Sequence, residues 1–419
     1  MSGVAGLRGT GDWGTDERPK NFREMIQWMQ PNGLAPIFGL TSKSGKKSVD
    51  DPEFNFWVET QMLIRLQVNG ALVAGDTTVV VDSADPTTTT LDANYGTATH
   101  LKAGDLLMVE PTSDSTTYNP EFIEVVTVAS DTSFTVRRAV AGSSAASIAD
   151  NQYLMLVGSA YAEGGTAPRA VSRNPVKFNN YIQIFKNSYE ITGTANATRA
   201  RTGEAWSNDK NRKMFDHARD IEMAFIFGRK NETASSSENG KPIRYMGGLM
   251  EIIPTTRKTV FTGDVSFEPG PNNFLDAVYK VFDFETPAGD TRLAWCGNSA
   301  MNALQKAAAG STNVRLNSDK VVRVYGTDFR EFIMPQGRIL MKTHPLMNIQ
   351  GGIYAKGMLI LDFASIKYVY LKGRDTRKFD DVQQRDEDVR RGYVQTDCSL
   401  ELDRGGVTCA YVGNIVQNS

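Results

Sequence analysis

The first residues whose spacing could serve chemistry are three glycines near the start of the chain. Gly9, Gly11 and Gly14 in the segment GTGDWG fit the G-x-G-x-x-G spacing of a dinucleotide-binding loop. Such a loop holds a pyrophosphate only when a strand precedes it and the N-terminus of a helix follows it. Neither element is predicted around this segment, so we interpret residues 1–20 as part of an extended arm.

The segment SKSGKKS at residues 42–48 has the lysines and glycine of a phosphate-binding P-loop but not its spacing. A P-loop needs a glycine, four further residues, and then Gly-Lys-Ser or Gly-Lys-Thr. Leu40 stands at the first glycine position and Lys47 at the hydroxyl position. A nucleotide-using enzyme with a degenerate site is therefore an alternative, which titration with ATP and NAD would test.

The three histidines, His100, His217 and His344, lie far apart in the sequence. No two of them have the i, i+4 spacing of a helical zinc site, and no Cys-x-x-Cys accompanies them. The Gly-x-Ser-x-Gly segment of many serine hydrolases is also missing. We therefore predict no metal, no cofactor and no catalytic residue, and we interpret His217 as an exposed or ion-paired residue on a charged helix.

Carboxylates are densest near residue 380, where they alternate with arginines. The residues of this segment are Asp380, Asp381, Asp386, Glu387 and Asp388 together with Arg385, Arg390 and Arg391. Mixed charge of this kind is typical of a solvated or subunit-facing salt-bridge surface, not of an acid/base pair. The sequence as a whole thus indicates a protein that is not an enzyme.

Composition describes an ordinary globular chain that is long enough for two or three compact units. It has 419 residues, of which 40% are hydrophobic and 22% charged. The net charge of -2 lacks the basic excess that tight binding of nucleic acid requires. Three cysteines are too few for a disulfide scaffold, and no apolar run reaches the roughly 18 residues of a membrane span. We expect a reducing cytoplasm and no membrane.

The elements that would carry these residues follow from the hydrophobic period. A short helix is predicted in residues 21–30, and alternation at Phe54, Phe56 and Val58 predicts a strand with one covered face. Short β-branched runs separated by turns follow, which is typical of a small β-barrel or sandwich. We place this inserted domain at residues 76–158.

The second half of the chain mixes helices and strands. Residues 177–195 predict a long strand pair, and residues 207–227 predict a helix of about six turns that Gly228 ends. The apolar stripe of this helix is Met214, Ala218, Ile221 and Phe225, and charged residues, Glu222 among them, occupy its remaining faces. Further helices are predicted near residues 274–281 and 298–310, with strands around them. The pair Gly405-Gly406 between two alternating runs predicts a hairpin. The fold class is therefore α+β with one all-β insertion.

Four segments of this half resemble a known family. They are Asn180–Phe185 followed by Ile191-Thr192-Gly193-Thr194, Asp220-Ile221-Glu222 before Ala224–Gly228, Met246–Leu249, and Leu400-Glu401-Leu402 through Ile415. They are similar to signatures of tailed-bacteriophage major capsid proteins of the Hong Kong 97 type, in the group with a β-domain inserted in the extended loop. Thr192 stands where that group has serine, and the sequence identifies no crosslinking Lys–Asn pair.

The resemblance implies a role for each part of the chain. The implied parts are an N-terminal arm at residues 1–50 that lies over a neighbouring subunit, an extended loop at 51–75 and 159–175, the inserted domain at 76–158, a peripheral domain with the long spine helix at 176–240 and 374–419, and an axial domain at 241–373. Such a protein would form the icosahedral head shell of a tailed phage around its double-stranded DNA.

The resemblance also implies partners and a location. The main partner would be the chain itself, in hexamers and pentamers. Portal and scaffolding proteins, decoration proteins, and packaged DNA contacted without sequence specificity would be the others. The protein would belong to the virion and would assemble in the cytoplasm of the host bacterium. A phage tail or baseplate component is the structural alternative, because small β-domains also decorate tails.

One aromatic cluster, Phe54, Phe56 and Trp57, falls on a limb of the extended loop that is too thin to have its own core. Aromatic side chains without an interior to fill are typical of protein interfaces. We therefore hypothesise that these three residues pack across subunits.

Overall fold

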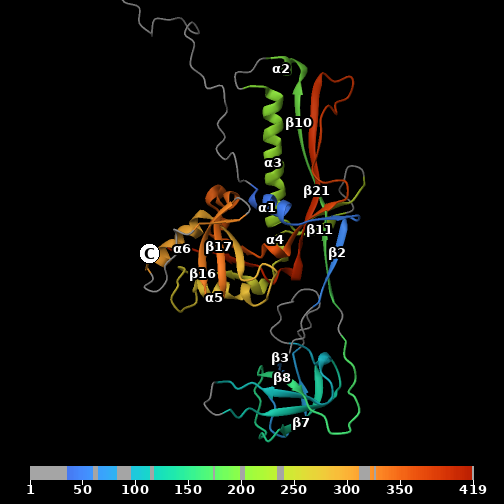
Figure 1. Ribbon diagram of the computed structural model, residues 1–419, viewed down its shortest axis with the longest axis vertical. Coiled ribbons are helices and arrows are strands. Elements are labelled where there is room, and N and C mark those ends of the chain that lie inside the picture. The colour runs from blue at the N-terminus through green and yellow to red at the C-terminus, as the bar shows by residue number, and fades with distance from the viewer. Residues whose placement is uncertain are drawn as a thin grey trace, which may run out of the picture.

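A long arm, a compact body and a separate β-unit make up the chain (Figure 1). The computed structural model describes residues 35–59, 65–82, 96–113, 118–172, 175–198, 203–233, 240–310, 321–324 and 327–417. The α+β class with an all-β insertion, predicted from the sequence, is confirmed. The segment GTGDWG, the predicted helix at residues 21–30 and the rest of residues 1–34 lie outside the described part.

The arm consists of the long helix α3 (Ala205–Phe227) packed on a five-stranded sheet. The strands lie in the order β1 (Lys46–Val49), β19 (Ile366–Leu371), β21 (Val389–Leu402) and β10 (Gln183–Thr192), with β20 (Arg377–Phe379) also beside β21. The short helix α2 (Gly193–Ala197) joins β10 to the loop before α3. Gly228 ends α3 as predicted, because a Cβ there would lie 2.5 Å from the carbonyl oxygen of Ala224.

The buried face of α3 is only partly the predicted apolar stripe. Ile221 and Phe225 are fully buried as expected. His217 and Glu222, which the sequence placed on the charged faces, are buried as well, so the interpretation of His217 as exposed or ion-paired is wrong. Its ring nitrogens lie 2.7 Å from Asn187 Oδ1 and 2.7 Å from Thr396 Oγ1, and they thus link β10 to β21.

Glu222 caps a second helix from outside that helix. Helix α1 (Pro36–Ser44) begins after Ala35, whose side chain has no oxygen to accept from the free N–H groups of the first turn. The Glu222 carboxylate accepts instead from the N–H groups of Ile37 at 2.9 Å and Phe38 at 2.7 Å. A residue of the arm therefore fixes where α1 lies.

The same carboxylate reaches the body of the molecule through His344. Nε2 of His344 lies 2.7 Å from Glu222 Oε1, and both side chains are fully buried. Nδ1 of His344 accepts from the N–H of Leu346 at 3.2 Å, which requires a ring that donates through Nε2 and is neutral. Glu222 thus accepts three hydrogen bonds from two other parts of the fold.

The body is a mixed seven-stranded sheet with helices packed on it. The strands lie in the order β13 (Lys258–Val260), β22 (Ala410–Gly413), β18 (Met358–Leu361), β14 (Thr291–Cys296), β17 (Gly337–Thr343), β16 (Thr327–Met334) and β15 (Val321–Val324). Helices α5 (Phe274–Val278) and α6 (Asn298–Gly310) pack on it through one apolar core. The short elements around it are α4 (Leu249–Ile252), η2 (Thr255–Arg257), η3 (Tyr279–Phe282), η4 (Pro345–Gly351) and η5 (Ile353–Lys356).

The C-terminal strands do not form the predicted hairpin. β21 pairs within the arm sheet, whereas β22 pairs with β13 and β18 of the body. The turn η7 (Asp403–Gly406), whose residues Arg404, Gly405 and Gly406 have positive φ values of 57°, 59° and 80°, takes the chain from one sheet to the other. The glycines predicted the turn correctly, but they did not predict which strands the turn connects.

Three further segments have neighbours in the structure that differ from those predicted from the sequence. The expected strand pair at residues 177–195 is wrong, because β9 (Val176–Tyr181) pairs with β2 (Glu53–Val58) while β10 pairs with β21. β19, expected in the axial segment, lies in the arm sheet after the turn η6 (Phe363–Ser365). Residues 35–49 pack within their own chain, since Ile37 and Leu40 are buried in its core.

The inserted unit is a closed β-barrel. Its strands lie in the order β3 (Arg65–Gln67), β8 (Tyr153–Ser159), β5 (Asp105–Val109), β6 (Phe122–Val128), β7 (Ser133–Val140) and β4 (Thr78–Val80), with η1 (Ala98–His100) alongside. The N–H of Asn69 donates to Val80 and that of Asp82 to Gln67, both at 2.9 Å, which joins the two outer strands. The barrel starts at Arg65, not at the predicted residue 76, since Leu66, Val68 and Leu72 fill its core.

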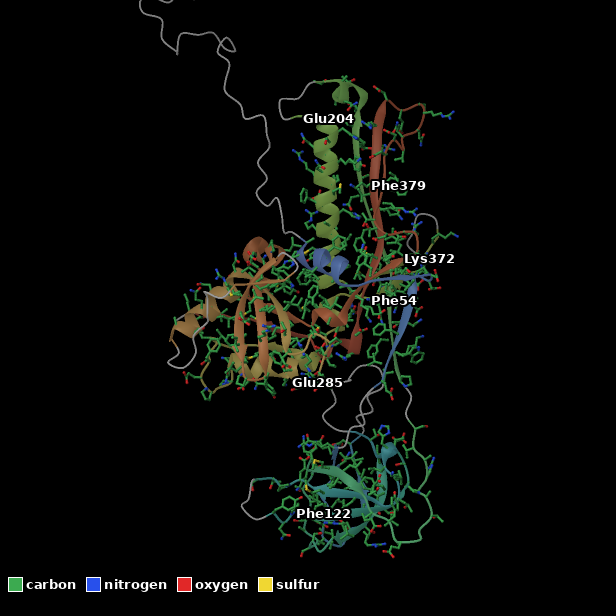
Figure 2. The ribbon with its side chains drawn as sticks, in the orientation of Figure 1. Phe54, Phe122, Glu204, Glu285, Lys372 and Phe379 are labelled. Carbon is green, nitrogen blue, oxygen red and sulfur yellow. The ribbon has the colours of Figure 1, made fainter. Side chains whose placement is uncertain are left out.

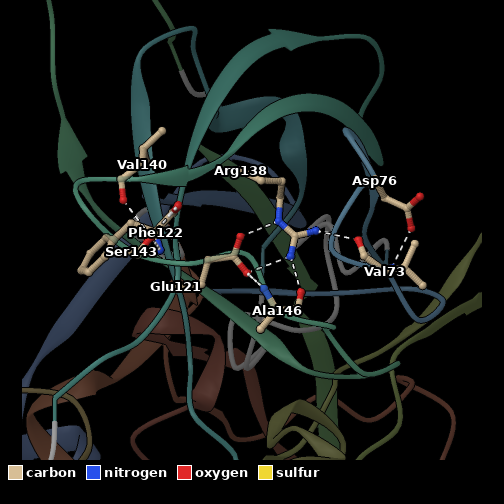
Figure 3. Close-up of polar contacts among 8 residues, drawn as sticks. All are labelled: Val73, Asp76, Glu121, Phe122, Arg138, Val140, Ser143 and Ala146. Atoms are coloured by element: carbon tan, nitrogen blue, oxygen red, sulfur yellow. Dashed lines mark hydrogen bonds and ion pairs between the residues drawn. The ribbon is translucent and has the colours of Figure 1, made fainter.

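One buried ion pair fastens the loops of the barrel (Figure 3). Nε of Arg138 donates to Glu121 at 2.6 Å, and the two side chains are 6% and 3% exposed. The same guanidinium donates to the carbonyl oxygens of Val73 and Ala146. Every side of the charge therefore has an acceptor, as a buried arginine requires.

None of the described helices is long and apolar enough to cross a membrane.

Replacing Glu222 should destabilise the whole molecule. In Glu222→Gln the new amide nitrogen must face an N–H donor, so we expect a loss of about 2–4 kcal/mol in the free energy of unfolding. Urea unfolding of the soluble subunit measures it. Asp209→Asn, on the exposed face of the same helix, should cost less than about 0.5 kcal/mol; an equal cost for both would contradict the role given to Glu222.

Candidate assembly interface

The limb between arm and barrel is a two-stranded ribbon of β2 and β9. The strands are antiparallel, with Glu53 opposite Tyr181 at one end and Val58 opposite Val176 at the other. A ribbon of two strands has too little interior to be stable by itself in water. Figure 2 shows the limb beside the arm at Phe54 and continuing toward the barrel.

The three aromatic residues predicted to pack across subunits have different environments. Phe54 is only 5% exposed and packs on Ile182 and Val369 of its own chain. Phe56 is partly buried and stacks on Phe178 across the ribbon, with ring centroids 5.7 Å apart. Trp57 is 63% exposed. Alternation along the strand therefore turns Phe54 inward and leaves Trp57 as the free aromatic surface.

Trp57 stands on the rim of an open groove of about 450 Å³. The groove is lined by Phe56, Trp57, Val58, Glu59, Pro287, Ser365, Lys367, Glu401, Asp403 and Arg404. These residues come from the limb, from the loop before β14, from η6 with the start of β19, and from the end of β21 with the turn η7. Aromatic residues and arginine, here Trp57 and Arg404, are enriched in protein–protein contacts.

Most charges in the groove are paired within the chain. Lys367 Nζ lies 2.7 Å from Asp403 and 3.4 Å from Glu401, and Lys47 Nζ lies 2.7 Å from Glu401. Partial burial lowers the pKa of Lys367, but hydrogen bonds to Asp403 and Glu401 outweigh it and raise that pKa above its usual value. The lysine is thus held as a cation that neutralises the groove's buried carboxylate.

The charged segment near residue 380 forms ion pairs on the arm. Asp380 accepts from Lys210 Nζ and from the Tyr189 hydroxyl, each at 2.5 Å, and Arg390 lies 4.4 Å from the Trp206 ring centroid. Arg391 lies 2.8 Å from Glu190. The interpretation of this segment as a salt-bridge surface is confirmed, and the pairs join α3 to the edge of its sheet.

The residues considered for metal or nucleophilic chemistry are spread through the fold. The described residues contain no group of three or more histidine, cysteine or carboxylate side chains that could hold a metal ion. His217 and His344 are engaged in the arm and body as above. All three cysteines are free and buried, and burial raises the pKa of Cys296 and of Cys409 to about 12. Their thiols are therefore not activated.

Sequence reasoning found Trp57 but not the residues around it. Arg404, Lys367 and Asp403 come from segments that are distant from the limb in sequence, and their side chains meet it only after the chain crosses between sheets. The positive φ of Arg404 leaves no mark in the sequence beyond the glycines that follow it.

Exposed aromatic surface on a thin limb, together with a long arm whose charges are paired, describes a chain built for assembly into a larger structure. Residues 10–409 match the family model described as SU10 major capsid protein. The chain belongs to this family. It is a major capsid protein of a phage and thus a component of the virion.

A curated relative and two solved structures are similar to the chain over most of its length. The major capsid protein of Pseudomonas phage PaMx41 is 26% identical over 385 residues, which cover 90% of this chain and 84% of the relative. The capsid of a native GTA particle is 10% identical with a TM-score of 0.43, and the structure from Mycobacterium phage Bobi is 9% identical with a TM-score of 0.43. Both structural matches cover 96% of each chain.

The ion pairs of Asp380 should make the arm sensitive to acid. The hydrogen bonds from Lys210 and Tyr189 lower the pKa of Asp380 below its usual value, so the stabilisation is full at neutral pH and is lost as the pH falls through that lowered pKa. Asp380→Asn should be less stable than the wild type at pH 7, and the difference should disappear as the pH falls through the lowered pKa of Asp380. Thermal unfolding across this range measures the difference, and Asp386→Asn, with no effect expected, is the control.

Proposed function

We propose that the chain self-assembles into the icosahedral head shell that encloses the double-stranded DNA of a tailed phage, without catalysis and without a cofactor. Assembly of a closed shell multiplies modest contacts between identical subunits into a rigid structure. The observation that carries the proposal is Trp57, a large aromatic side chain that is 63% exposed on a limb with no core of its own.

The parts of the fold acquire roles in this proposal. The α3 arm corresponds to the peripheral domain of the Hong Kong 97 type, the seven-stranded body to the axial domain, and the β2–β9 ribbon to the extended loop. The strand pairings support moving β19 to the peripheral domain and β22 to the axial domain. They also support starting the inserted domain at Arg65.

Further partners follow from the same proposal. Hexamers and pentamers of the chain would meet portal and scaffolding proteins, and the inserted barrel would be a site for decoration proteins. DNA would touch the inner face without sequence specificity, since the net charge of -2 provides little attraction for phosphate. Assembly would take place in the cytoplasm of the host bacterium.

Electron microscopy of the full chain expressed in bacteria tests this function. We expect polyhedral shells of uniform diameter. Tubes or discs would favour a tail or baseplate component instead, and specific binding heats with ATP or NAD would favour the nucleotide-using enzyme.

The limb provides a sharper test through two neighbouring aromatic residues. Trp57→Ala should leave the unfolding free energy of the subunit unchanged and should block shell formation, because the indole packs only against another subunit. Phe54→Ala should instead cost about 3 kcal/mol in subunit stability, because that side chain is buried in its own chain. Unfolding and sedimentation of both variants measure the two effects.

The control for this pair is Tyr118→Ala, which removes an aromatic side chain that is 78% exposed on the barrel. It should assemble normally. Normal shells from Trp57→Ala would contradict packing of Trp57 across subunits.

A further inference from the structure

Arg404 adopts a backbone conformation that favours glycine. Its φ and ψ are 57° and 23°, and Gly405 after it has nearly the same values. A side chain at this conformation brings Cβ close to the backbone, which costs free energy that glycine avoids. Such strain is usually retained where the side chain has a task.

One donor atom of the Arg404 guanidinium, Nη1, has no acceptor among the residues that the structure describes. This atom is buried, and within the described part of the chain no hydrogen bond or ion pair reaches it. The carboxylates of Glu401 and Asp403 in the same groove lie within ion-pair distance of lysines, at 2.7 Å from Lys47 and Lys367 respectively. A donor atom without an acceptor is costly. Because Arg404 is only partly buried and lines the groove, a partner outside the chain could supply the acceptor.

We propose that this acceptor is a carboxylate of a second copy of the chain, which enters the groove beside Trp57 and pairs with Arg404. The inference rests on the proposed self-assembly and adds a residue to it. Two features favour a protein copy over nucleic acid. The indole of Trp57 on the rim offers apolar area to a protein surface. Among the residues that line the groove, Lys367 is already paired with Asp403 and Glu401, so Arg404 is left to bind one carboxylate and not a chain of phosphates.

The substitution Arg404→Gly separates an assembly role from a structural one. Glycine suits the positive φ, so the melting temperature of the unassembled subunit, measured below its assembly concentration, should be unchanged or higher. The concentration at which shells appear should rise by about tenfold or more, because the other copy's carboxylate is left buried without a partner. Arg404→Lys keeps the charge and should assemble better than Arg404→Gly.

Controls identify where the acceptor lies. Asp386→Asn, which lies outside the groove, should assemble like the wild type. Glu59→Gln should leave the melting temperature of the unassembled subunit unchanged; a lower value would place the acceptor at Glu59 of the same chain, and the inference fails. A lower melting temperature of Arg404→Gly, or shells at the wild-type concentration, would also overturn it. Shells of Arg404→Gly that form normally and lack only nucleic acid would also contradict the inference. Wild-type protein that forms no shell at any concentration would refute the proposed function itself.

Discussion

The fold depends on one carboxylate kept away from water. Glu222 is fully buried, and removing a charge from water costs several kcal/mol unless hydrogen bonds compensate. Compensation comes from the first turn of α1 on one side and from His344 of the body on the other. The N-terminal helix α1 and the body are therefore both held against α3 of the arm. Around this point lies an apolar cluster that contains residues of all three parts.

Away from Glu222, the barrel and the limb are stabilised in two different ways. The barrel has its own apolar core and a sheet closed on itself, so its strand edges are paired. The limb has neither, and its outward face carries Trp57. Order in the limb comes from Phe54 and Ile182 against the arm sheet at one end. A subunit of this kind combines rigid parts with a thin connection whose outer surface is left for other molecules.

Local patterns in the sequence predicted the elements well and their connections poorly. The period of α3, its end at Gly228 and the strands of the barrel follow from residues close in sequence. The sequence around Gly405-Gly406 predicts a hairpin, because glycine permits a turn in either case. The strands that pair with β22 are β13 and β18, which lie far away in the chain, so the local pattern does not reveal the crossing. Glu222 was placed on a polar face because its compensating donors come from residues 37, 38 and 344. Burial of charge is a tertiary property that periodicity does not record.

The entry and exit strands of the barrel are hydrogen-bonded neighbours, since Leu66 of β3 lies opposite Leu154 of β8. A module whose two ends leave side by side imposes almost no geometry on the chain that carries it. Its size and surface are then free to diverge during evolution while the limb beneath stays the same. The same property makes this junction a natural position for inserting a foreign domain.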